Sequence, residues 1–153
     1  MLICIGVIAV IVGIYSFINR PQAQAKGSID TITSVDLPTQ NSDVVAMNVS
    51  IYNTGEKPFY IRNISAEIQN DAGTFTDKAL SPMDFDRYYQ AFPDLKKAPL
   101  DPLKVETKIE PGSSARGTMI VIFPVSADAF AHRKTLRVIV QPYDQPVSLV
   151  LTK

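Results

Sequence analysis

VAMNVSIYNTGEKPFYIRNISAEI, residues 45–68, is the stretch that decides the fold of this chain. Apolar side chains at the odd positions from Val45 to Ile51 alternate with small or polar ones, which is the pattern of a strand with one buried face. Asn53-Thr54-Gly55-Glu56 follows and can turn tightly, because asparagine and glycine accept positive φ. A second strand follows Pro58 and covers residues 59–68. The stretch therefore predicts a β-hairpin.

The second strand of this predicted hairpin changes its buried face partway along. Its apolar residues occupy odd positions as far as Ile61 and even positions from Ile64 onward. One extra residue near Arg62 or Asn63 accounts for such a shift, because a bulge exchanges the faces to which the later side chains point. We expect a bulge or a change of sheet at this point.

The rest of the chain adds short strands and one helix. Ser81-Pro82-Met83-Asp84 is typical of a helix start, and with Pro93 it predicts a helical insert of about three turns over 81–93. Six further strands are predicted, over 29–35, 74–77, 105–109, 118–123, 136–141 and 147–151. About eight strands without alternating helices favour a mainly β, immunoglobulin-like two-sheet antiparallel sandwich over residues 42–153.

An apolar segment precedes this domain. Residues 2–18, LICIGVIAVIVGIYSFI, carry no charge, and a helix of this length rises about 25 Å, near the lower limit for a bilayer core. Arg20 and Pro21 follow with a charge and a helix breaker. We predict a transmembrane anchor over residues 1–20 and a tether with the first strand over 21–41. The residues expected to contact lipid are Leu2, Ile5, Ile8, Ile11, Ile14, Tyr15 and Phe17.

Processing and orientation leave two interpretations open. Ala23-Gln24-Ala25 has the small-x-small pattern of a signal-peptidase site, and cleavage after Ala25 would release a secreted domain. The apolar run is longer than most signal peptides and lacks a basic start, so we expect a retained, single-pass anchor. Arg20 and Lys26 alone favour a cytoplasmic domain. The peptidase-like site and the sandwich fit export, and we expect the C-terminal domain on the periplasmic or extracellular side.

Charge and residue types limit the chemistry that this chain can perform. Lysine plus arginine equals aspartate plus glutamate at 15 each, so no basic field would attract nucleic acid. His132 is the only histidine and Cys4 the only cysteine, which leaves neither a two-histidine metal site nor an intrachain disulfide. The spacing of the acids Asp84, Asp86, Asp94 and Asp101 lacks the glycine and the ligand order of a calcium loop. We predict no catalytic residues, no cofactor and no metal, and therefore not an enzyme.

Two stretches bear a likeness to a known class of domain. Residues 47–68 resemble the strand, Asn-x-Gly turn, strand signature of bacterial membrane-anchored extracytoplasmic immunoglobulin-like domains, including the telokin-like and late-embryogenesis-type sandwiches. Residues 111–117 (PGSSARG) and 119–124 (MIVIFP) look like the turn and penultimate strand of these domains. The resemblance implies a non-catalytic accessory domain, often tethered to a membrane. The insert is not part of that pattern.

The insert supplies one candidate contact surface. Phe85, Tyr88, Tyr89 and Phe92 recur at spacings of three and four, so one face of the helix would be apolar. This face either caps the open end of the sandwich or docks on a membrane partner, since tyrosine and phenylalanine are favoured at interface hot spots.

These observations lead to an expected function. We expect a membrane-anchored accessory or structural subunit that contacts membrane lipid and other membrane-protein subunits, for example in a respiratory or photosynthetic complex. A free-standing envelope module that binds a ligand, peptide or polymer is the other interpretation.

Overall fold

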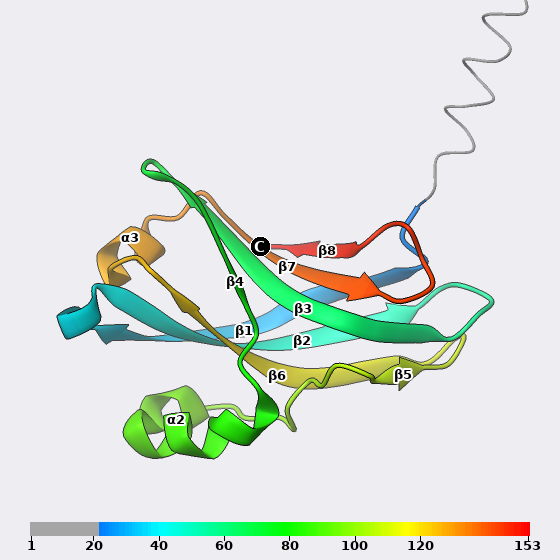
Figure 1. Cartoon of the computed structure of the whole chain (residues 1–153), viewed down its shortest axis with the longest axis horizontal. Coiled ribbons are helices and arrows are strands. Elements are labelled where there is room, and N and C mark those ends of the chain that lie inside the picture. Colours follow the sequence, from blue (N-terminus) through cyan, green and yellow to red (C-terminus); the bar gives the residue numbers. More distant parts are fainter. Residues whose placement is uncertain (1–21) are drawn as a thin grey trace, which may run out of the picture.

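Two antiparallel sheets pack face to face in the computed structural model, which describes residues 22–153 (Figure 1). The first sheet has the strand order β1-β2-β6, and the second has the order β4-β3-β7-β8 with β5 paired to β3. The first sheet contains β1 (Ala25–Leu37), β2 (Ser42–Asn53) and β6 (Ser114–Phe123). The second contains β3 (Phe59–Asn70), β4 (Gly73–Lys78), β5 (Lys108–Ile109), β7 (Thr135–Pro142) and β8 (Leu149–Thr152). The predicted mainly β, two-sheet architecture with a short helix is confirmed.

The predicted anchor lies outside the described residues, and so do all seven of its residues expected to contact lipid. Within residues 22–153, every helix is too short or too polar to cross a membrane. The first strand begins at Ala25, earlier than the expected residue 29. Its residues 26–28 are all exposed, and exposed residues alternate with half-buried ones over 33–37. Only residues 22–24 of the described chain precede it.

The predicted β-hairpin of residues 45–68 is wrong, because its two strands belong to different sheets. β2 pairs with β1 and β6, whereas β3 pairs with β4, β5 and β7. The turn after Asn53 therefore carries the chain across the sandwich instead of folding it back on a neighbour. Both strands still point their apolar side chains inward, because the two sheets share one core. Local alternation identifies the buried face of each strand but not its hydrogen-bonded neighbour.

The predicted bulge in β3 is confirmed. The register against β7 shifts between Ile61 and Asn63. Ile61 is buried before the shift and Ile64 after it, so the strand stays in contact with the core on both sides of the bulge. A bulge of this kind exchanges the strand faces by one residue, as the change of apolar parity requires.

The insert is shorter than predicted and lies in a different place. A 3-10 turn, η2 (Pro82–Asp84), leads into α2 (Phe85–Ala91), and a second 3-10 turn, η3 (Pro93–Lys96), follows it. Phe92 leaves helical geometry with φ −133° and ψ 79°, because the proline after it disfavours the α conformation. Figure 1 shows α2 against the outer face of the three-stranded sheet, and not over an open end of the sandwich.

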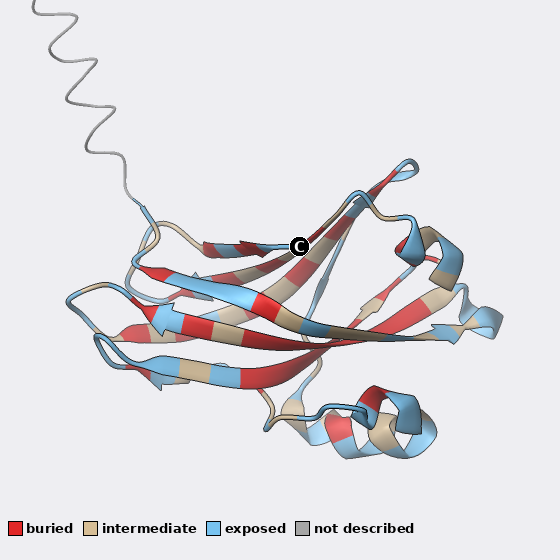
Figure 2. Cartoon of the chain, turned by 180° about the vertical axis from the view of Figure 1, so that it is seen from behind, coloured by how far each residue is buried: buried red, intermediate tan, exposed pale blue. Residues whose placement is uncertain are grey.

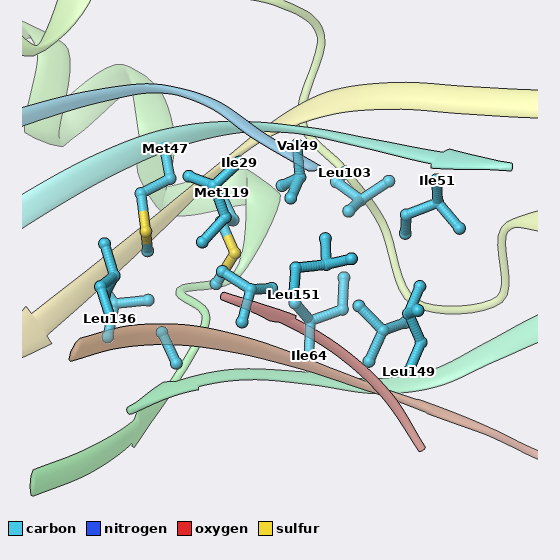
Figure 3. Close-up of a cluster of buried hydrophobic side chains, with 14 of the residues drawn as sticks. Ile29, Met47, Val49, Ile51, Ile64, Leu103, Met119, Leu136, Leu149 and Leu151 are labelled. Carbon is cyan, nitrogen blue, oxygen red and sulfur yellow. The ribbon is translucent and has the colours of Figure 1, made fainter. Parts of the chain in front are cut away.

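The main core lies between the sheets and combines the inward side chains of both (Figure 3). Met47, Met119 and Leu136 are fully buried there. Figure 2 shows buried residues along the strands and exposed ones on the outer side of the insert. A short helix that the sequence analysis missed, α3 (Ala127–Ala131), closes one end of this core, where Phe130 stacks on Phe123 with ring centroids 5.9 Å apart.

Candidate interaction surfaces

The chain enters the fold through a clamped junction. The backbone oxygen of Gln24 accepts hydrogen bonds from the amides of Thr54 and Gly55, both at 3.1 Å. The amide of Gln24 donates to Oε1 of Gln145 at 3.3 Å. Ala25, the next residue, is buried opposite Asn53 in β2. Gln24 is therefore held to both sheets, and we call the end of the sandwich that contains it the junction end (Figure 1).

A buried asparagine shapes the turn that receives Gln24. Nδ2 of Asn53 donates to the backbone oxygens of Lys57 at 2.8 Å and Ile109 at 2.9 Å. Its Oδ1 accepts from the amide of Gly55 at 2.9 Å. One side chain thus satisfies three backbone groups that would otherwise be costly to bury. The sequence pattern identified Asn53 as a turn residue, but its bond to β5 in the other sheet could not be read from local sequence.

The four aromatic residues of the insert come together on the face that points toward the sheet. Phe85 is buried and belongs to a second apolar cluster with Val44 and Ile120. The rings of Phe85 and Tyr89 meet edge to face at 5.9 Å, and those of Tyr88 and Phe92 lie 6.4 Å apart. Tyr88, Tyr89 and Phe92 are only partly buried. Docking of a partner on these residues stays a prediction.

A small groove adjoins the partly exposed rings of the insert. It has a volume of about 250 Å³, and its walls include Leu37, Gln40, Tyr88, Phe92 and Ile122. Leu37 ends β1, a strand of 13 residues that starts at the junction. At 3.3 Å per residue this strand spans roughly 40 Å. The groove therefore lies at the end of the sandwich remote from the junction.

Two buried polar side chains on the outer face of the sheet hold the start of the return segment, residues 98–103, and the end of that segment pairs with the edge of β6. Thr118 Oγ1 donates to Asn48 Oδ1, and Asn48 Nδ2 donates to the backbone oxygen of Ala98, both at 2.6 Å. The amide of Leu100 donates to Thr118 Oγ1 at 2.9 Å. A Cβ atom on Gly117 would lie 2.8 Å from the backbone nitrogen of Leu103, so the segment approaches β6 as closely as a glycine permits. We call this arrangement the Asn48–Thr118 clamp.

A carboxyl group is buried at the remote end. Asp43 is fully buried, and neither of its carboxyl oxygens has a hydrogen-bond partner within residues 22–153. Burial is the main cause that raises the pKa of Asp43, to about 6, and the negative charge of Asp36 opposite it on β1 is the second. The Ser34 side chain and the positive charge of Arg133 lower this pKa, but by less. The Arg133 guanidinium sits 4.2 Å from the Phe130 ring centroid beside α3. No signal in the sequence distinguished Asp43 from a surface acid.

The other chemistry-bearing residues lie apart. His132 is exposed at the end of α3, with its Nδ1 3.3 Å from Asp128 Oδ1. Asp84 pairs with Arg87, and Asp94 with Lys97, both at 3.3 Å. In the part of the chain that the structure describes, no three histidine, cysteine or acidic side chains gather as metal ligands would. Two acids of the insert, Asp84 and Asp94, are thus used in local ion pairs.

Comparisons with known proteins give a fold-level likeness to bacterial proteins. No protein-family model and no curated protein matches the chain. A structure described as a "putative lipoprotein (ycdA)" from Bacillus subtilis is 14% identical with a TM-score of 0.49, over 88% of this chain and 37% of its own. A conserved hypothetical protein from Bacillus anthracis is 8% identical with a TM-score of 0.43, over 87% and 92%. An ApaG protein from Pseudomonas aeruginosa is 18% identical with a TM-score of 0.38, over 74% and 90%.

All of these TM-scores lie below 0.5, so the likeness assigns neither a family nor a function to this chain. The similar structures are β-rich bacterial proteins, and the chain spans just over a third of the length of the Bacillus subtilis protein.

Proposed function

We propose that this protein is a membrane-anchored, non-catalytic accessory subunit whose immunoglobulin-like sandwich packs, outside the cytoplasm, on a larger membrane protein complex. The observation that carries the proposal is the clamped junction. Gln24 bonds to the turn after β2, and only residues 19–23 separate it from the apolar segment. Those residues can span at most about 20 Å. A retained anchor therefore keeps the junction end close to the bilayer, next to neighbouring membrane proteins.

The same junction supports retention of the anchor. Cleavage after Ala25 would cut inside β1 and remove the Gln24 oxygen that receives two backbone hydrogen bonds. It would also remove the buried Ala25 side chain from the core. Each lost hydrogen bond to a native backbone group costs about 1 kcal/mol. The domain is therefore more complete with Gln24 and Ala25 attached.

The test is purification of the full-length protein from its native membranes in mild detergent, followed by native electrophoresis and mass spectrometry. We expect it to migrate in a stoichiometric complex. A long glycine-serine insertion after Pro21 should leave the anchor and the fold intact but lower recovery of the complex, because the domain is no longer held at the bilayer. The matched control carries the same insertion in the exposed turn at Ala72 and should keep the complex.

Two outcomes would contradict the proposal. A wild-type protein that migrates alone in mild detergent would remove the basis for an accessory role. Full complex recovery with the insertion after Pro21 would show that the short junction has no part in assembly.

A second function has one observation in its favour. A groove of about 950 Å³ lies at the junction end, and its walls include Gln24, Lys57, Tyr60, Asp144 and Gln145. Amide, hydroxyl and charged groups suit a hydrogen-bonding ligand such as a glycan or peptide. If the protein is a free-standing binding module, full-length protein in detergent should be stabilised against heat by an oligosaccharide or peptide in a screen. Tyr60→Ala should abolish that stabilisation.

A further inference from the structure

We propose that the junction end rests on the lipid headgroup layer of the membrane, and that three tyrosine–cation pairs make the contact. The inference rests on the proposed function, because it requires the retained anchor. The proposed binding partner is the bilayer surface itself. The main evidence is that the three pairs lie together at the junction end, the end of the sandwich that follows the apolar segment along the chain.

The three tyrosines lie at strand ends that meet at the junction. Tyr52 is the last residue but one of β2, and its partner across the strands is Lys26. Tyr60 is the second residue of β3, and the amide of Tyr143 donates to its backbone oxygen at 3.1 Å. Within residues 22–153 there are five tyrosines, and these are three of them. The other two belong to the insert on the remote half.

Each of these rings carries a cation. Lys26 Nζ lies 5.4 Å from the centroid of the Tyr52 ring, and Lys108 Nζ lies 5.8 Å from that of Tyr60. The guanidinium carbon of Arg62 lies 5.9 Å from the centroid of Tyr143. An aromatic ring under a cation places an apolar surface beside a group that binds phosphate. Tyrosine is itself enriched at membrane–water interfaces, because its ring is apolar and its hydroxyl is polar. Lysine and arginine stems can follow apolar surface while their charges stay in the headgroups.

The pairs flank the sandwich on both sides. Tyr52 points outward from the three-stranded sheet, because its neighbours Ile51 and Asn53 point into the buried interior. Tyr60 points outward from the other sheet, since Phe59 and Ile61 are buried. Tyr52 and Tyr143 remain 38% and 49% exposed, although both are large aromatic residues. Contacts on both sides would hold the domain upright on the bilayer, which a single patch would not do.

The carboxylates at the junction end determine which kind of lipid surface this end of the domain can contact. Glu110 pairs with Lys108 at 2.5 Å, and Glu106 accepts a hydrogen bond from the Tyr143 hydroxyl. Glu56 and Asp144 lie on the junction-end groove. Positive and negative charges are thus interspersed, so the surface suits a headgroup layer of mixed charge. We expect the contact to form in zwitterionic lipid, without a requirement for anionic lipid.

The chain contains no tryptophan, so a single introduced tryptophan gives a fluorescence signal from its own position alone. Full-length Tyr52→Trp and Tyr143→Trp variants are reconstituted into phosphatidylcholine vesicles that contain headgroup spin-labelled lipid. Their fluorescence should lose most of its intensity, because both positions would lie within the headgroup layer. A matched Tyr88→Trp variant reports the remote half and should keep its fluorescence.

The outcomes separate this inference from the proposed function. If the protein floats with the vesicles but the tryptophans at the junction end are no more quenched than the one in the insert, the headgroup contact is overturned while the anchor stands. If the protein does not float, or its mass shows the loss of residues 1–25, both proposals fail. Quenching that appears only with anionic lipid would overturn the contact with a mixed-charge headgroup layer.

Discussion

The outer face of the three-stranded sheet differs between its remote half and its junction half. In the remote half, Val44 and Ile120 are apolar and lie buried beneath the insert. In the junction half, the outward residues of the same two strands include Ser50 and Arg116, which surround Asp30 of β1. The Asn48–Thr118 clamp stands where the two halves meet. The outward side chains of β2 and β6 therefore change from apolar to polar at the position where the segment that covers these strands ends.

Two carboxyl groups at opposite ends of this sheet also differ in their surroundings, Asp43 on the inward face of β2 and Asp30 on β1. Burial raises the pKa of Asp43 at the remote end. Hydrogen bonds from Ser28 and Ser50 and the nearby Arg116 lower the pKa of Asp30 in the junction half. The groups are chemically identical, so the opposite directions come from their surroundings alone. Asp43 on β2 and Asp30 on β1 thus show that opposite ends of one sheet give a carboxylate very different environments.

Removing the cover from the remote half should have the largest effect. Phe85→Ala deletes the buried ring of the insert and should lower the free energy of unfolding by about 3 to 5 kcal/mol, since the sheet and α2 cannot close the cavity completely. Urea denaturation followed by circular dichroism measures the change. Met83→Ala, two residues earlier and 90% exposed, is the matched control and should change stability by less than about 0.5 kcal/mol. If Phe85→Ala and Met83→Ala changed the free energy of unfolding by equally small amounts, the insert would not be part of the core.

The buried carboxyl of Asp43 should make stability depend on pH. The pKa of about 6 in the folded state lies above the ordinary value of 3.8 for an aspartate, so the folded state binds the proton more tightly than the unfolded chain. The free energy of unfolding should therefore fall as the pH rises from about 4 to about 6, by about 1 to 3 kcal/mol, and then level off.

Asp43→Asn should flatten this dependence and raise stability at neutral pH relative to the wild type. Urea midpoints measured at several pH values from about 4 to 8 give the comparison. Asp36→Asn removes only the neighbouring exposed charge that adds to the shift, so it should reduce the dependence in part and not abolish it. A wild-type stability that rises over this pH range would contradict the assigned environment of Asp43.

Breaking the boundary between the halves should have a smaller effect. Asn48→Ala leaves the Ala98 oxygen without its buried donor and should cost about 1 to 2 kcal/mol. A double-mutant cycle with Thr118→Val separates the pair from its surroundings. Additive effects of the two substitutions would show that the hydrogen bond between them contributes nothing. Proteolysis should cut the return segment of the Asn48→Ala variant sooner than that of the wild type, because its attachment is weakened.

The smallest effect is expected in the junction half. Asp30→Asn removes an ion pair with Arg116, whose side chain is 62% exposed, at a distance of 3.1 Å. Solvent screens such a pair, so the change in the free energy of unfolding should stay below about 1 kcal/mol. Thermal unfolding at low and high salt measures it. A loss as large as that of Phe85→Ala would show that the two halves do not differ as described.

Several features of the fold could be read from the sequence because they depend on nearest neighbours along the chain. Alternation located the strands, and the change of apolar parity after Ile61 located the bulge in β3. Ser81 and Pro82 marked the start of the insert, and the spacing from Phe85 to Phe92 predicted its apolar face. Ser126, which caps α3 by accepting from the Ala129 amide, was a signal that could have revealed that helix.

The sequence by itself determined which side chains of each strand face the core, because strand geometry places alternate residues on opposite sides. It also determined which segment of the insert is apolar on one side. Only the tertiary structure decided that β2 and β3 lie in different sheets, that the insert covers the outer face of β2 and β6, and that Gln24 is clamped at the junction. These features depend on contacts between residues distant along the chain, and local periodicity carries no information about which distant surface a buried face will meet.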